Sequence, residues 1–413
     1  MDSSIEEPLL ASNAHNQEPG NEQNGRINTR ALVLLFLNVL VVDIGYIINL
    51  APMTRIFEDI TCRQYLHASG AAFLSEGGRP DESRCKIPEV QGPVAELFGY
   101  QTFFDSLVGI ILGLHFGALA DRIGRRPIYV LGLGGSFLAS CWKLYVCWMG
   151  FPLRYVWLSS AFLILGGGDT VLNACLTMII TDATPAALRS RVALYFAASN
   201  LGSEVIAPPI ASYFIDSNPW IPVVIGVCCN GLAVLLASCL PETLPPKTKQ
   251  TETINDAHDA PGEDRLEPID GTAKDGSFKS TIKHMLQLLQ YIRGQRALLL
   301  LVCVFAVSDF ARRSMQFLVQ YASVRYRMTL GQANYLLAWR AMVAIALHMT
   351  IMPATDKFVQ SKLRMPPRKK DLTLARISIC LYTAGFVALA FAPTVVTVIF
   401  GYRAQPQGFV GVM

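Results

Sequence analysis

Gly117-Ala-Leu-Ala-Asp-Arg-Ile-Gly-Arg-Arg-Pro127 decides the fold, because this short basic stretch separates two long apolar segments. Glycines at four-residue spacing lead into it and form a small-residue face that a neighbouring helix can approach closely: Gly109, Gly113 and Gly117. Its arginines are the residue type that membrane proteins keep on the cytoplasmic side. Gly124 permits a tight reversal, and Pro127 suits the first turn of a new helix. We therefore expect two membrane-spanning helices joined by a tight cytoplasmic turn.

The composition is that of a membrane protein. The 413 residues are 52% hydrophobic and 16% charged, with a mean hydropathy of +0.36, which is too apolar for an ordinary soluble protein. They predict an all-α polytopic protein that lies in a lipid bilayer. The net charge of +4 is modest and no nucleic-acid-binding module is evident, so we expect no nucleic-acid partner. We find no paired nucleophile and base, metal-ligand spacing or phosphate-binding glycine loop, and expect no enzyme, metal or cofactor.

The basic stretch also carries a family signature. Its pattern is Gly, three residues, Asp, a basic residue, one residue, Gly and two basic residues, met by Gly117, Asp121, Arg122, Gly124, Arg125 and Arg126. It resembles the loop between the second and third helices of the major facilitator superfamily of secondary transporters. The resemblance implies a fold of two helical bundles in which these six residues form a gating loop. In that family the loop Asp contacts the eleventh helix; here Arg189 or Arg191 could partner Asp121.

The order of apolar segments predicts four regions. Residues 1–30 form a disordered cytoplasmic tail, 31–240 an N-terminal six-helix bundle, 241–296 a cytoplasmic linker, and 297–413 a C-terminal bundle. A polar loop over 51–91 separates the first two spans, and a single span is expected over 154–180. The resembled family usually has twelve helices, and this chain has room for nine or ten. We therefore expect a second half that is truncated.

We number the loops between successive spans in chain order. The second, fourth, sixth and eighth loops hold more than twice as many lysines and arginines as the first, third, fifth and seventh. By the positive-inside rule the amino terminus is then cytoplasmic and the loop 51–91 faces outward. As a separate expectation, we place the protein in the plasma membrane rather than the vacuole. This loop holds Cys62 and Cys85, whereas the other eight cysteines lie in apolar segments. In an oxidising compartment the two loop cysteines can form a disulfide; two free thiols are the alternative.

Six ionisable residues interrupt the predicted spans: Asp43, Asp105, Asp169, Glu204, Asp309 and Arg340. Charges inside a bilayer are costly, so we expect these residues to form the substrate and proton pathway. At about 1.5 Å of rise per residue, Asp43, Glu204 and Asp309 each lie about 18 Å from the cytoplasmic end, with Arg340 at a similar level. A carboxylate there can bind a proton, and the arginine can neutralise it or hold an anionic substrate. The alternative is a set of structural charges, such as Asp309 paired along its own helix.

The fifth span carries a second resemblance. Small residues replace glycines in a match to the signature of family members that export by antiport: Ser203, Ala207, Pro208, Ala211 and Ser212. The arginine expected in the fourth helix of such exporters is missing, and Gly166-Gly-Gly-Asp169 stands there instead. Together with the long outer loop, which resembles fungal members, these features predict a proton-coupled transporter of a small organic molecule that works by alternating access. Export is favoured over an uptake symporter, and a non-transporting membrane sensor or interaction protein is a third possibility.

Overall fold

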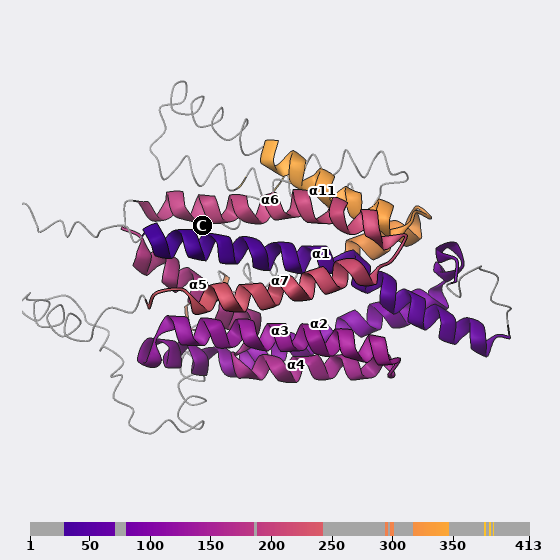
Figure 1. Cartoon of the computed structure of the whole chain (residues 1–413), viewed down its shortest axis with the longest axis horizontal. Coiled ribbons are helices and arrows are strands. Elements are labelled where there is room, and N and C mark those ends of the chain that lie inside the picture. The colour runs from indigo at the N-terminus through magenta and orange to yellow at the C-terminus, as the bar shows by residue number, and fades with distance from the viewer. Residues whose placement is uncertain are drawn as a thin grey trace, which may run out of the picture.

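The computed structural model describes residues 29–70, 80–185, 188–242, 294–295, 298–300 and 317–346, with residues 376, 380 and 383. All regular structure in these residues is helical, which confirms the expected all-α class for the described part of the chain. The long helices lie side by side along the length of the molecule (Figure 1). They are α1 (Thr29–Ala68), α2 (Pro88–Ile123), α3 (Arg125–Met149), α5 (Gly168–Ala183), α6 (Arg189–Ile215), α7 (Trp220–Ser238) and α11 (Leu330–Ala346).

The remaining elements are short. Helix α4 (Ser159–Phe162) lies between the 3-10 turns η2 (Leu153–Leu158) and η3 (Leu163–Leu165), and η1 (Glu82–Cys85) precedes α2. Residues 317–325 are helical and lead into α11. We call α1 to α7 the first group, and residues 317–325 together with α11 the later group.

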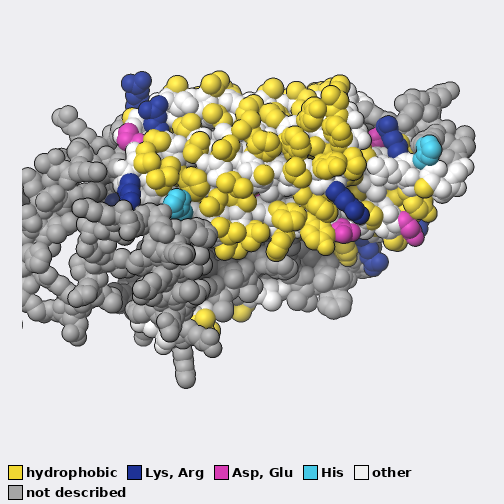
Figure 2. All heavy atoms as spheres, turned by 90° about the horizontal axis from the view of Figure 1, so that it is seen from below, with side chains coloured by type: hydrophobic (Ala, Val, Ile, Leu, Met, Phe, Trp, Pro, Cys, Tyr) yellow, Lys and Arg dark blue, Asp and Glu magenta, His cyan; other side chains and the backbone are white. Residues whose placement is uncertain are grey.

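The described helices fit a membrane by length and composition. Five segments are long and apolar enough to cross one: Thr29–Ala68, Pro88–Ile123, Arg125–Met149, Leu153–Ala183 and Trp220–Ser238. Figure 2 shows the matching surface, in which hydrophobic side chains cover the middle of the face and charged side chains gather toward its two ends. We name these ends the arginine end, where α2 turns into α3, and the disulfide end, where Cys62 is bonded to Cys85.

Apolar packing holds the first group together toward the arginine end. Side chains from α1, α2, α3, α5 and α7 form one cluster, with Leu35, Ile128, Leu133 and Ile179 among its buried members. A second cluster joins the first group to the later group near the disulfide end, and there Ala51 and Ile215 meet Val319 and Leu330. Helix α11 crosses α6 near this end and diverges from it toward the other (Figure 1).

The expected polar loop over 51–91 is wrong in its first part, because α1 continues as a helix to Ala68. Beyond residue 50, apolar side chains recur at helical spacing and pack against α2: Met53, Ile56, Phe57 and Ile60. The charges between them, such as Arg55 and Glu58, pair with each other. Pro52 and these charges made the segment look like a loop, yet the helix accommodates both.

The single span expected over 154–180 corresponds to the apolar segment Leu153–Ala183, but this segment is not one continuous helix, because it breaks between η3 and α5. Gly167 and Gly168 have backbone φ angles of 78° and 75°, which residues other than glycine rarely adopt. Gly166 lies so close to Gly132 of α3 that a Cβ atom would overlap the α3 backbone. Close approach of two backbones therefore explains this glycine run.

The small-residue face before the basic turn packs less than expected. A Cβ atom on Gly109 would contact Thr170 of α5, at 2.7 Å from its Oγ1. A Cβ atom added to Gly113 or Gly117 would meet no atom of another described element within 4 Å. Within the described part of the chain, a close helix approach is thus present at Gly109 and not at Gly113 or Gly117.

Candidate functional site

A charged pair joins the first group to the later group. Arg340 of α11 directs Nη2 to Oε2 of Glu204 on α6, at 2.5 Å. The arginine side chain is 6% exposed and the glutamate side chain 22% exposed. Opposite charges that are largely removed from water stabilise each other only when they stay paired. If α11 moves relative to α6, the two side chains must therefore either separate or reorient so that they stay paired.

Asp43 of α1 lies next to this pair. Its half-buried carboxylate faces the side chain of Asn200 and lies close enough to Glu204 for electrostatic repulsion. We call these residues the central cluster: Asp43, Asn200, Glu204 and Arg340. With both carboxylates ionised the cluster carries one excess negative charge, which a proton or a cationic group can neutralise. Asn200 was not predicted from the sequence, although a polar amide inside an apolar span was a usable signal.

Toward the disulfide end, α6 and α11 are held by hydrogen bonds. Asn334 donates from Nδ2 to the Pro208 carbonyl at 2.9 Å and to Ser212 Oγ at 3.2 Å. Ser212 donates to the Gly331 carbonyl at 3.0 Å. The small signature residues Ala207 and Ala211 are fully buried against α1. The degenerate signature of the fifth span therefore lies where α6 packs between α1 and α11.

Three of the six predicted charges lie apart from the central cluster or outside the described residues. Asp105 accepts hydrogen bonds from Gln101 Nε2 at 2.9 Å and Ser160 Oγ at 2.6 Å, and so holds α2 against α4. Asp169 is exposed in the first turn of α5, directly after the break. Asp309 lies outside the described residues. Among the five predicted charges that the structure describes, Asp43, Glu204 and Arg340 lie together.

The basic turn is shorter than expected, because Gly124 alone separates α2 from α3. Its φ of 120° favours glycine, and a Cβ atom there would lie 2.6 Å from Oε2 of Glu242. Glu242 also accepts the Arg125 backbone N–H at 3.1 Å. Glu242 was not predicted as part of this site; an acidic residue directly after the sixth span was the available signal.

The arginines tie this turn to neighbouring helices. Arg125 donates to Asp182 and, at 2.9 Å, to the Met178 carbonyl of α5, and Arg126 donates to the Ser238 carbonyl of α7. Arg122 and the exposed Asp121 lie in the last turn of α2. No described side chain pairs with Asp121, and Arg189 donates instead to the Thr184 carbonyl at 3.4 Å. The partner expected for Asp121 is therefore not seen at Arg189.

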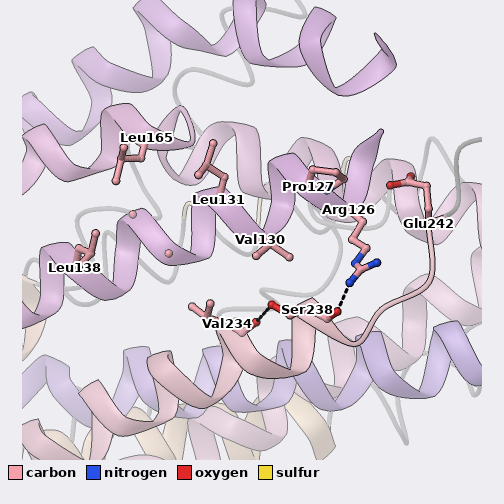
Figure 3. A pocket seen from close by; sticks show the side chains of 11 residues that line it. Arg126, Pro127, Val130, Leu131, Leu138, Leu165, Val234, Ser238 and Glu242 are labelled. Atoms are coloured by element: carbon pink, nitrogen blue, oxygen red, sulfur yellow. Dashed lines mark hydrogen bonds between the residues drawn. The ribbon is translucent and has the colours of Figure 1, made fainter. Parts of the chain in front are cut away.

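A cavity of about 550 Å³ lies beside this turn, between α3 and α7 (Figure 3). Its walls are apolar, with Val130, Leu138 and Val234 among the lining residues, and Arg126 and Glu242 lie at the arginine end. No residue of the central cluster lines it. This cavity is therefore separate from the candidate site.

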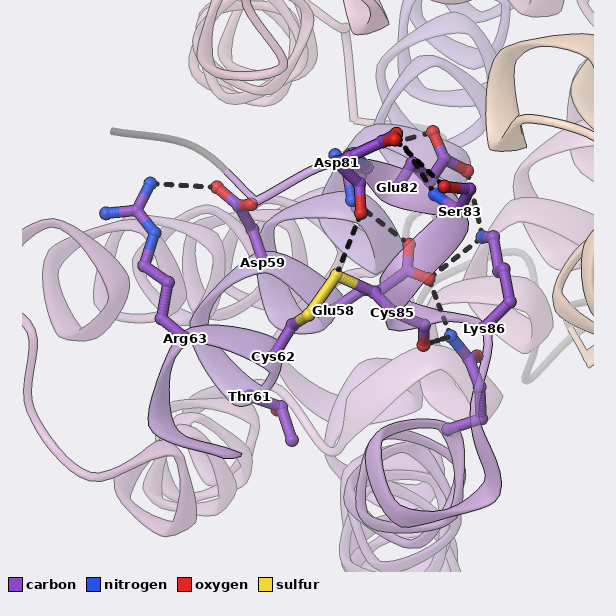
Figure 4. The surroundings of a disulfide bond; sticks show 12 residues. Glu58, Asp59, Thr61, Cys62, Arg63, Asp81, Glu82, Ser83, Cys85 and Lys86 are labelled. Atoms are coloured by element: carbon purple, nitrogen blue, oxygen red, sulfur yellow. Dashed lines mark hydrogen bonds and ion pairs between the residues drawn. A yellow bond between two sulfur atoms is a disulfide. The ribbon is translucent and has the colours of Figure 1, made fainter. Parts of the chain in front are cut away.

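At the opposite end a disulfide bond joins Cys62 of α1 to Cys85 of η1, with their Cα atoms 5.5 Å apart. The sequence left a disulfide and two free thiols as alternatives, and the structure has the bond. Charged residues surround it (Figure 4).

Comparisons with known proteins give one consistent result. The sequence model of the Major Facilitator Superfamily matches residues 89–412. The chain is similar to the MFS efflux pump atnC of Emericella nidulans, with 33% identity over 395 residues that cover 96% of this chain and 75% of that protein. It is also similar to the efflux pump ustT of Aspergillus flavus, with 27% identity, covering 91% of this chain and 72% of that protein.

Solved structures show the same fold. The human organic anion transporter MFSD10 superposes with a TM-score of 0.52 at 14% identity, covering 93% of this chain and 84% of that one. A mutant of a peptide transporter, POT, in complex with sulfate gives a TM-score of 0.50 at 14% identity, covering 92% of this chain and 79% of that one. At this identity the likeness concerns the arrangement of helices alone.

Proposed function

This chain belongs to the Major Facilitator Superfamily, and from that premise we propose that it exports a small organic molecule from the cytoplasm in exchange for protons. It is a multi-pass integral membrane transporter and not an enzyme. Export is supported by the relatives named as efflux pumps. Exchange for protons is supported by the two neighbouring carboxylates of the central cluster.

The observation that carries this proposal is the contact between Glu204 and Arg340 across α6 and α11. If the first and later groups rock against each other during alternating access, this pair lies on the moving boundary. A proton on Glu204 or Asp43 weakens the attraction to Arg340, because it neutralises a carboxylate. A substrate that occupies the central cluster also weakens the attraction between Glu204 and Arg340. Proton and substrate can therefore bind there in turn.

We propose that the arginine end is cytoplasmic, as the distribution of basic residues predicts, and that the disulfide end faces outward across the plasma membrane. A disulfide is favoured on the outer side, because the cytoplasm keeps thiols reduced. The predicted division into tail 1–30, bundle 31–240, linker 241–296 and bundle 297–413 goes with this orientation and stays a proposal. Asp169 and Asp309 remain predicted pathway residues, and Asp121 a predicted gating residue.

Transport direction can be tested in inverted plasma-membrane vesicles that contain the whole chain. The vesicle interior is made acidic, and the probes are rhodamine 6G, a cationic organic dye, and fluorescein, an anionic one. Export predicts that a transported dye accumulates inside, and that an uncoupler which abolishes the pH gradient prevents accumulation. An uptake symporter would instead accumulate dye in right-side-out vesicles with acid outside, and that result would contradict export.

The matched variants are Glu204→Gln and Asp105→Asn. Glu204 lies in the central cluster, whereas Asp105 holds α2 against α4 through hydrogen bonds that an Asn oxygen can still accept. We expect Glu204→Gln to lower coupled accumulation at least about tenfold, and Asp105→Asn to retain most of it. Equal loss in both variants would argue against a specific role for the central cluster.

A further inference from the structure

A compact set of charges lies beside the disulfide bond at the disulfide end. Arg55 and Glu58 come from the extension of α1, and Glu82 and Lys86 come from η1 and the residue after it. Their side chains are between 1% and 12% exposed. Lys86 Nζ lies 2.9 Å from Glu58 Oε1 and 2.8 Å from Glu82 Oε1 (Figure 4), and Arg55 lies near both carboxylates. Two positive and two negative charges thus compensate each other away from water.

Glu82 extends this set to the later group. Its Oε1 accepts the backbone N–H of Leu330 at 2.7 Å, and Leu330 is the first residue of α11. The first amides of a helix have no partner within the helix, and a carboxylate is favoured there by the helix dipole. Glu82 therefore binds α11 at the point where a negative charge stabilises it most.

The residues that cap α11 do not bond the Leu330 amide, which is therefore free to donate to Glu82. Thr329 and Gln332 form a reciprocal capping pair, in which the Gln332 N–H donates to Thr329 Oγ1 at 3.2 Å and the Thr329 N–H donates to Gln332 Oε1 at 3.1 Å. This pair provides hydrogen-bond acceptors for the amides of Thr329 and Gln332, which precede and follow Leu330 and Gly331. The Leu330 amide is then completed by Glu82 of the first group.

A second polar bridge crosses the same boundary. Gln320 donates from Nε2 to the Gln91 side-chain oxygen at 2.9 Å and to its backbone carbonyl at 3.2 Å. Gln91 is fixed in turn, because its Nε2 donates to Glu58 at 2.6 Å and to the Cys85 carbonyl at 3.0 Å. Both Gln91 and Gln320 are buried.

The disulfide bond sets the position of both bridges. Cys85 ends η1, three residues after Glu82 and six before Gln91, and Cys62 anchors it to the extension of α1. Next to the bridges lies the apolar cluster that joins Ala51 and Ile215 to Val319, Ala322 and Leu330. Any opening of this end must expose that cluster and separate both bridges.

We propose that the disulfide-bonded segment Glu82–Gln91 is a latch that holds the disulfide end closed, in which Glu82 completes the first turn of α11 and Gln91 binds Gln320. The latch rests on the proposed rocking of the two groups. In this proposal, the long α1 extension and the disulfide determine how readily the transporter opens outward.

The test measures access to the apolar cluster and needs no substrate. Ala322, which is 3% exposed, is replaced by Cys as a reporter, and right-side-out vesicles with the whole chain are treated with a membrane-impermeant maleimide. The same chain without the reporter supplies the background from native cysteines. Glu82→Ala is expected to raise the reporter labelling rate about tenfold, because it removes a charge-assisted hydrogen bond from the closed state alone. The double variant Cys62→Ser with Cys85→Ser should raise it as well.

The matched control is Asp59→Asn on the same helical extension. Among the described residues, Asp59 pairs with the half-exposed Arg63 and makes no ion pair with the later group, so labelling should stay at the level of the starting chain. Labelling in Glu82→Ala equal to that in Asp59→Asn would overturn the latch. If Glu82→Ala does not reach the membrane, Gln320→Ala serves as the test variant. It should raise the reporter labelling rate about threefold, and an unchanged rate would contradict the latch. A chain that labels as expected but moves no dye contradicts the proposed function and leaves the latch standing.

Discussion

Glu204 and Arg340 bury opposite charges against each other, and Asp43 adds a second carboxylate beside them. Replacing Arg340 by Met leaves the Glu204 carboxylate without its cation in a place with little water. We expect this change to destabilise the protein by about 3–5 kcal/mol. The double variant Glu204→Gln with Arg340→Met should recover most of that loss, because the cluster then carries one negative charge, on Asp43, which is the same net charge as in the unaltered chain. Thermal unfolding of the purified protein in detergent measures both; a double variant as unstable as the single one would contradict the pairing.

The sequence predicted that Asp43, Glu204 and Arg340 share one layer, but not that Glu204 and Arg340 touch. Counting residues along a helix gives the depth of a side chain, whereas its direction depends on how neighbouring helices are rotated. The same limit explains Asp105, which lies apart from the central cluster and accepts hydrogen bonds from Gln101 and Ser160, and whose role in the pathway stays a prediction. Neutral partners such as Asn200 and Asn334 were missed because amides in apolar spans are less conspicuous than charges.

At the scale of elements, the single-residue turn between α2 and α3 depends on Gly124. An alanine there must adopt a φ of 120° and must also displace Glu242. We expect Gly124→Ala to destabilise the protein by about 1–3 kcal/mol. The control is Gly134→Ala in the middle of α3, where nothing lies within 4 Å of the added Cβ and φ is ordinary. A lower melting temperature for Gly124→Ala alone is the expected result, and equal shifts would argue against strain at the turn.

A second element-scale prediction concerns Asp216, between α6 and α7. Asp216 is an exposed residue, but partial burial of its carboxyl raises the pKa above the ordinary value of 3.8; the charge of Glu82 raises it further, and Arg55 opposes the rise. Part of that burial comes from α11, since a Cβ on Gly331 would lie 3.4 Å from Asp216 Oδ1. The closed state therefore holds the proton more tightly than an open one, and acid favours closure.

The measurement is the labelling rate of the Ala322→Cys reporter as the outside pH falls toward and below the raised pKa of Asp216. The rate should fall relative to that of Asp216→Asn, whose side chain does not titrate. The ratio of the two removes the pH dependence of the thiol reaction itself. A ratio that does not change with pH would contradict closure by Asp216.

Helix positions were predicted well where apolar residues run without interruption, and poorly where other forces acted. The extension of α1 was missed because Pro52 and paired charges look like a loop until their partners are known. The break before α5 was missed because glycines in an apolar run suggest packing, and positive φ at Gly167 and Gly168 cannot be read from composition. Both depend on contacts between residues distant in sequence.

At the scale of the whole molecule, several connections join the first and later groups, among them the hydrogen bonds of Asn334 and Ser212 between α6 and α11. The central cluster lies between α6 and α11 midway along the bundle, and the latch lies at the disulfide end. Fold class and family followed from the sequence alone, because the basic turn and the apolar spans are local patterns. The latch did not, since Glu82 and Leu330 are 248 residues apart. A transporter of this design would open outward only when the latch separates and the contacts between α6 and α11 rearrange.

The most direct measurement of the central claim is proton movement when substrate is added to acid-loaded inverted vesicles. Exchange predicts that a transported dye entering the vesicle releases protons from it, which a dye sensitive to the pH gradient reports. Glu204→Gln should abolish this release and Asp105→Asn should keep it. If vesicles with Glu204→Gln release protons as fast as those with the unaltered chain, the central cluster does not couple proton movement to transport.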